Sequence, residues 1–301
     1  MKLVVRFMKL GRMAFISHLD LQRALLRGLR SAGLAPAYSQ GFNPHPKMSL
    51  ALPLALGFES LCEWLEVELP ADCAGRAGRI GDNRNSGVGN AGKSAGGGLN
   101  GTEVIMRLNK VLPEGIIVTE AQFVEAAYDA VSGKPMGVGA GAGGSCAKAT
   151  AAAGVGAGKL HAKPGAAQTP KKHSLASLVR YAEYDIAVPV AAGSAVDDIA
   201  DVQERISQYM AQEHIYIEKE NRKKGRVDTI DIRPLISSFK AKRGASEKSS
   251  YTCTVSASAG ALLNPLLLIQ SYYEHQGTPL EISELKIVRT GIVFANLSEN
   301  R

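Results

Sequence analysis

The sequence predicts an α+β fold of two tandem ferredoxin-like halves, each an antiparallel sheet with helices on one face. Three observations lead to this prediction. In the first half, alternating apolar residues and apolar residues at helical spacing follow in the order strand, helix, strands, helix, strand. The second half repeats the plan. A Gly/Ala-rich insertion that we expect to be disordered interrupts the first half, and a Gly/Ala-rich linker, also expected to be disordered, joins the two halves. The predicted units are residues 1–129, a linker over 130–174, and residues 175–301.

The strands of the first half follow from alternation. Residues 1–10 read as a strand in which Leu3, Val5 and Phe7 share one parity and Lys2 and Arg6 the other. Residues 48–56 form an edge or irregular strand because Pro53 interrupts them. The clearest strand is 62–69, in which Glu63 shares the parity of the apolar residues. A buried carboxylate is costly unless it is paired. Glu63 is therefore expected at the rim of the strand or against a cation such as an arginine, and the rim is the favoured interpretation.

The first helix has clear end signals. Ser17 is a good N-cap and Asp20 follows three residues later, so the helix should begin at His18. Gly33 should end it. At 100° per residue, one face carries apolar residues and the opposite face carries arginines. The apolar residues are Leu21, Leu25, Leu29 and Ala32, and the arginines are Arg23, Arg27 and Arg30.

The remaining elements are assigned in the same way. Residues 71–101 are poor in large apolar side chains and are predicted to be a disordered insertion. A helix over 102–112 and a strand from 116 complete the first half. In the second half we expect strands over 182–188, 215–217, 227–232, 251–256 and 286–294, and helices over 196–210 and after Asn264, with Pro265 at the first position.

Two motifs carry a family resemblance. They are Phe15-Ile16-Ser17-His18-Leu19-Asp20-Leu21-Gln22-Arg23 and Tyr38-Ser39-Gln40-Gly41-Phe42-Asn43-Pro44-His45-Pro46-Lys47. This pair resembles the signature of the radical-SAM-associated domain family of unknown function, whose members occur alone or fused behind a radical SAM enzyme. The resemblance covers residues 1 to about 70 well, and 178–188 and 231–234 more loosely. It implies a radical SAM enzyme as partner but names no reaction.

The cysteines argue against radical SAM chemistry in this chain itself. Radical SAM enzymes hold their iron–sulfur cluster with three closely spaced cysteines. The four cysteines here, Cys62, Cys73, Cys146 and Cys253, are widely scattered. We therefore expect reduced thiols, no metal site and no cofactor, and any such chemistry would belong to the partner.

Basic residues point to RNA. The formal net charge is +7, which favours an acidic partner, most commonly nucleic acid. The predicted contacts to RNA are Arg23, Arg27, Arg30, Gln40, Asn43, Lys47, Arg222, Lys223, Lys224 and Arg226, with a further basic cluster at 240–243. Tyr38, Phe42 or Trp64 are candidates to stack on unpaired bases.

Two histidines are candidates for acid–base catalysis. His18 lies at the helix start, and His45 is held between Pro44 and Pro46, with Asp20 and Lys47 near each in sequence. The alternative is that His18 packs at the helix start and that His45 makes backbone hydrogen bonds in a rigid loop, and this structural interpretation is favoured. A metal site on His18, Asp20 and His45 is a weaker hypothesis still.

Three functions remain open. The leading one is a radical-SAM-associated accessory protein that binds RNA or presents a substrate, and for it a non-enzymatic role is favoured over an enzymatic one. The second is a metal-independent endoribonuclease whose architecture resembles that of CRISPR repeat-processing enzymes. The third is a protein-interaction adaptor that docks through the Pro44-His45-Pro46 loop.

The sequence favours a cytoplasmic protein with no membrane association. Lys2, Arg6 and Lys9 interrupt the first apolar run, so no signal peptide is expected. The longest apolar run, around 266–269, is too short to span a bilayer.

Overall fold

The computed structural model describes residues 1–70, 100–124, 174–189, 198–221, 225–243 and 248–295. The insertion predicted over 71–101 and the linker predicted over 130–174 lie almost wholly outside these residues. The predicted end of the insertion is wrong by one residue, because helix α3 (Gly101–Val111) already begins at Gly101. Its start is fixed by Asn100, whose side-chain oxygen accepts a hydrogen bond from the Glu103 amide at 2.8 Å.

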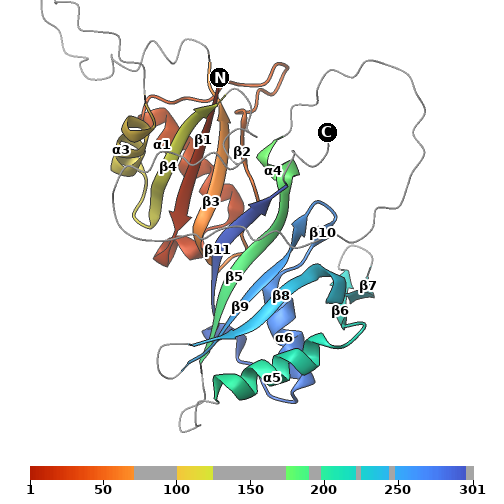
Figure 1. Cartoon of the computed structure of the whole chain (residues 1–301). Helices are drawn as coiled ribbons and strands as arrows, with labels where there is room; N and C mark the ends of the chain where they lie inside the picture. Colours follow the sequence, from red (N-terminus) through yellow and green to blue (C-terminus); the bar gives the residue numbers. More distant parts are fainter. Residues whose placement is uncertain (71–99, 125–173, 190–197, 222–224, 244–247, 296–301) are drawn as a thin grey trace, which may run out of the picture.

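The first half is an antiparallel sheet in the order β4-β1-β3-β2, with α1 and α3 on one face (Figure 1). Its elements are β1 (Lys2–Lys9), η1 (Gly11–Phe15), α1 (His18–Ser31), β2 (Met48–Leu50), β3 (Glu59–Glu68), α3 and β4 (Ile116–Val124). Leu3, Val5 and Phe7 of the central strand β1 are buried against both helices. The apolar residues of one parity in the sequence are therefore the residues of β1 that face the two helices.

The second half has the strand order β11-β5-β9-β8 and is also antiparallel. Its elements are α4 (Leu175–Leu178), β5 (Val179–Pro189), α5 (Ile199–Met210), β6 (Tyr216–Asn221), β7 (Arg226–Asp231), η3 (Arg233–Leu235), β8 (Ile236–Lys242), β9 (Lys248–Ser258), β10 (Ala261–Leu262), α6 (Pro265–His275), η4 (Ile282–Glu284) and β11 (Lys286–Phe294). The hairpin β6–β7 forms a separate two-stranded sheet. The sequence prediction included this hairpin but missed β8.

One strand joins the two halves. β11 pairs in parallel with β3, with Val288 opposite Glu59 and Arg289 opposite Ser60. The result is a mixed α/β fold with a nine-stranded, mostly antiparallel sheet. Residues on the back of the first half's sheet, among them Cys62 and Trp64, belong to the core cluster of the second half. The back of the first half's sheet therefore packs into the core of the second half, which makes that core a shared one, while the helix-covered face of the first half has a separate core.

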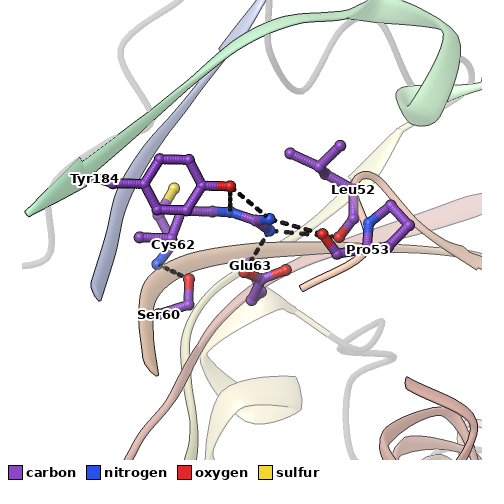
Figure 2. Close-up of polar contacts among 7 residues, drawn as sticks. Leu52, Pro53, Ser60, Cys62, Glu63 and Tyr184 are labelled. Carbon is purple, nitrogen blue, oxygen red and sulfur yellow. Dashed lines mark hydrogen bonds and ion pairs between the residues drawn. The ribbon is translucent and has the colours of Figure 1, made fainter. Parts of the chain in front are cut away.

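A buried ionic cluster lies at this joint (Figure 2). Arg289 on β11 and Glu63 on β3 are each 1% exposed, and their Nη1 and Oε1 atoms are 2.8 Å apart. Arg289 Nε and Nη2 donate to the Tyr184 hydroxyl at 3.2 and 3.0 Å. The second N–H group of Nη1 donates to the Leu52 carbonyl at 3.4 Å, and that of Nη2 donates to the Pro53 carbonyl at 2.7 Å. The five N–H groups of the guanidinium thus all have acceptors, as a buried charge requires.

The cluster overturns the favoured interpretation of Glu63. The carboxylate does not lie at a rim, because it is enclosed between the two halves and meets an arginine 226 positions away. Burial raises the pKa of Glu63, and the neighbouring Arg289 opposes that rise. Lys9, also 1% exposed, donates to the Ala14 carbonyl at 3.2 Å.

Within the described residues, no helix is both long enough and apolar enough to cross a membrane.

Candidate nucleic-acid interface

Helix α1 presents its charged face to solvent because its other face is fixed in the core. The Asp20 amide donates to Ser17 Oγ at 3.1 Å, so the helix starts where the sequence predicts. The buried residues are Leu21, Ala24, Leu25, Gly28 and Leu29. Arg23, Arg27 and Arg30, named here the arginine row, are all exposed on the opposite side. Seven residues along a helix rise about 10 Å, so the row spans roughly that length.

The positive charge of the row is only partly balanced within the protein. Arg23 Nη1 lies 2.9 Å from Asp20 Oδ1, but the two side chains are 72% and 55% exposed. Such an exposed pair is weak and is easily exchanged for a ligand anion. Hydrogen bonds from the Ser17 hydroxyl and from Arg23 lower the pKa of Asp20. Arg27 makes no hydrogen bond or ion pair with any other described residue.

The row continues into the loop that follows α1. Arg30 donates to the Tyr38 hydroxyl, and its guanidinium carbon lies 5.9 Å from the centre of the Tyr38 ring. The base of the loop is tied to the sheet, because the Ala37 amide donates to the Glu68 carbonyl at 2.7 Å. Lys47 Nζ lies 2.8 Å from Glu68 Oε1. Gln40, Asn43 and Lys47 are exposed as the RNA prediction requires.

The structure does not bring the two candidate histidines together. His18 begins α1, whereas His45 belongs to the loop attached to the far end of that helix through Arg30 and Tyr38. Helix α1 has 14 residues and is therefore about 20 Å long, and the two histidines belong to its opposite ends. One proton-transfer site needs its acid and base around a single bond, so His18 and His45 do not form such a pair.

Each histidine also has a structural explanation. His18 is half-buried, and its Nε2 atom lies 3.2 Å from Gln22 Nε2. The backbone amide of His45 donates to Ser39 Oγ at 2.9 Å, and its carbonyl accepts from the Ser39 amide at 2.8 Å. The metal set of His18, Asp20 and His45 is not assembled. Across the described part of the chain, no group of three or more His, Cys, Asp or Glu side chains is placed to hold a metal ion.

The other basic residues lie in the second half. Arg222, Lys223 and Lys224 fall outside the described residues. Arg226 Nε lies 2.6 Å from Asp228 Oδ1, and Lys242 pairs with Asp185. Figure 1 shows β6, β7 and β8 in the lower half of the molecule and α1 in the upper half. These residues therefore do not extend the arginine row into one continuous surface.

Trp64 is unavailable as a base-stacking residue. It is 9% exposed and packs edge-on against Phe294, with ring centres 5.8 Å apart. Arg6 covers it, with the guanidinium carbon 5.9 Å from the ring centre. Its place on β3 between the halves explains this burial. The other two aromatic candidates for stacking are more exposed, Tyr38 at 36% and Phe42 at 107%.

The segment Asp231-Ile232-Arg233-Pro234, which carries part of the looser resemblance, has a structural role. Asp231 Oδ1 accepts from the amides of Ile215 and Arg233 at 3.1 and 3.0 Å, and Oδ2 lies 2.8 Å from His214 Nδ1. The hydrogen bond from His214 is the main cause that lowers the pKa of Asp231. Arg233 Nε donates to the Met210 carbonyl at 3.0 Å. The motif therefore ties the end of α5 to the β6–β7 hairpin.

Comparison with known proteins identifies a family. No curated protein matches this chain. One family model does, described as an uncharacterized protein conserved in bacteria (DUF2344), and it matches residues 2–80 and 162–265. The first range contains α1 and the loop that follows it, and the two ranges together cover more than half of the chain. The chain therefore belongs to this uncharacterized bacterial family.

Proposed function

We propose that this protein is a non-enzymatic accessory protein that binds RNA and presents it to a separate radical SAM enzyme. The observation that carries the RNA part is the arginine row, three exposed charges of one sign on a helix whose opposite face is fixed in the core. Arginines arranged in this way suit contacts to successive phosphates. The adjoining loop adds exposed Gln40, Asn43 and Lys47.

The radical SAM part rests on the motif resemblance and on the cysteines. Cys62 and Cys253 lie on different strands, β3 and β9, and both are buried. Burial raises the pKa of both thiols, that of Cys253 to about 12, so both stay protonated at neutral pH. Cys73 and Cys146 lie outside the described residues. A partner enzyme that carries its own cluster would supply the chemistry. A cytoplasmic location is part of the same proposal, on the ground that Lys2, Arg6 and Lys9 interrupt the first apolar run.

We also propose that each half has the ferredoxin-like topology. The strand orders β4-β1-β3-β2 and β11-β5-β9-β8 correspond position by position, and each half has one helix after its first strand and one before its last. This correspondence supports a tandem ferredoxin-like arrangement, in which the β6–β7 hairpin is an insertion.

Two experiments test the proposal. Binding of the full chain to total cellular RNA tests the RNA part, and the absence of binding at low salt would refute it. Co-purification from a bacterial extract at high salt, with mass spectrometry of the captured proteins, tests the partner part. A radical SAM enzyme among the captured proteins is expected, and its absence in repeated captures would refute that part.

We predict that neither histidine supports RNA cleavage. Wild type, His18→Ala and His45→Ala should all leave a labelled RNA intact in the presence of a chelator, because no acid–base pair is assembled. The measurement is gel analysis of the labelled RNA after prolonged incubation. Cleavage by the wild type that disappears in His45→Ala would establish the endoribonuclease alternative instead.

A further inference from the structure

Residues 39–45 form a closed loop with a phenylalanine at its tip. The Ser39 amide donates to the His45 carbonyl at 2.8 Å, and the His45 amide donates to Ser39 Oγ at 2.9 Å. Below this closure, Tyr38 and Pro46 form a β-bridge. Phe42 at the tip has an exposed fraction of 107%. A phenyl ring held fully in water forgoes the free energy that burial provides.

The exposure of Phe42 is built into the loop. Pro44 and Pro46 fix their own φ angles and hold Asn43 and His45 in extended conformations. Gly41 has a φ of +124°, which side chains rarely adopt, and it turns the chain just before Phe42. The ring is thus carried on a stiff, hydrogen-bonded support, and little conformational entropy remains to be lost when a ligand covers it.

The surroundings of Phe42 are polar and cationic. Gln40 and Asn43 flank the ring along the chain and are exposed. At the base of the loop, Lys47 is paired with Glu68, and Arg30 covers the Tyr38 ring. Phe15, Leu19, Leu56 and Met106 are also strongly exposed in this half. None of them belongs to this loop, and Phe15 and Leu19 lie at the opposite end of α1. A single ring among polar groups and beside arginines does not resemble the apolar centre of a protein-binding patch.

We propose that Phe42 stacks on an unpaired base of a single-stranded RNA whose phosphates contact the arginine row. This inference rests on the proposed RNA binding and specifies its substrate class. Every base has an apolar π-face that a phenyl ring can cover, whereas in a duplex neighbouring base pairs already cover those faces. Gln40 and Asn43 carry amides that can hydrogen-bond to the edges of a base next to the ring.

The test compares one labelled RNA of about 12 nucleotides as a single strand and annealed to its complement. Phe42→Ala should weaken single-strand binding by about 5- to 150-fold, the equivalent of about 1–3 kcal/mol for one stacked base. It should leave duplex binding and the salt dependence of single-strand binding unchanged, because no phosphate contact is removed. Phe42→Trp should retain single-strand affinity, and its added indole should lose fluorescence when RNA binds.

Phe15→Ala is the matched control, since Phe15 is 72% exposed but lies away from the loop. It should bind RNA as the wild type does. If Phe42→Ala also binds as the wild type does while binding still depends on the arginines, this inference is overturned and the proposed function stands. If the wild type binds no RNA, the proposed function falls and this inference falls with it. A protein partner lost in Phe42→Ala, with RNA binding unchanged, would also overturn it.

Discussion

Replacing Arg289 with alanine is expected to lower the free energy of unfolding by about 3–5 kcal/mol, the usual cost of breaking a buried ion pair. The substitution leaves the Glu63 carboxylate buried without its cation and removes the donors that satisfy the Tyr184 hydroxyl and the Leu52 and Pro53 carbonyls. It also creates a cavity in the shared core. Urea denaturation followed by circular dichroism measures the change.

Arg23→Ala is the matched control, because it removes an arginine whose ion pair with Asp20 is largely exposed. Its free energy of unfolding should change by no more than about 1 kcal/mol. If Arg289→Ala and Arg23→Ala proved equally stable, the buried cluster would contribute no more to the free energy of unfolding than an exposed ion pair does.

The loss of stability in Arg289→Ala should also depend on pH, and its direction follows from the pKa of Glu63. Without the arginine, burial still raises the pKa of Glu63, and only the Ser60 hydrogen bond and the charge of Lys9 remain to oppose that rise. The folded-state pKa therefore lies further above the unfolded value of about 4.3. A raised pKa means that the folded state holds the proton more tightly. Stability is therefore retained below the unfolded pKa and is lost as the pH rises toward the folded pKa. Relative to wild type, the variant should be less destabilised near pH 4 than at pH 7.

The triple substitution Arg23/Arg27/Arg30→Ala is expected to weaken RNA binding by about 10- to 100-fold at low salt, since in the proposed complex each arginine contacts a charged phosphate. All three side chains are exposed and their helix is held by the opposite face, so the fold should be unaffected. Fluorescence anisotropy with labelled cellular RNA measures the affinity, and a thermal melt confirms folding.

A charge-matched control comes from the second half. Lys240/Lys242/Arg243→Ala removes three exposed cations from the β8 region, the same number as the triple variant and away from α1. It should reduce affinity far less than the triple variant. Equal losses in the two variants would mean that binding follows net charge and not the arginine row.

Local features of the fold were predictable from the sequence because neighbouring residues determine them. Ser17 and Asp20 set the start of α1, and leucine spacing set its buried face. The alternation of Leu3, Val5 and Phe7 identified the core face of β1. The arginine row follows directly from the same helical periodicity.

Features that depend on residues distant in sequence could not be predicted. Glu63 carried a detectable signal, a carboxylate at an apolar position, but its partner is 226 residues away on the strand that joins the halves. The same joint buries Trp64 and so removed one aromatic candidate. The separation of His18 from His45 depends on where the loop after α1 packs, at the far end of the helix beside Arg30, which sequence proximity does not reveal.

The most direct test of the account is the salt dependence of RNA affinity for the wild type and the triple arginine variant between about 50 and 200 mM salt. Each lost contact to a single-stranded phosphate should reduce the logarithmic slope by about 0.7, so three should reduce it by about 2. A steep wild-type slope that flattens by this amount in the variant would show that the arginine row contacts RNA phosphates. Equal slopes, or no binding by the wild type at about 50 mM salt, would contradict an RNA-binding role for this surface.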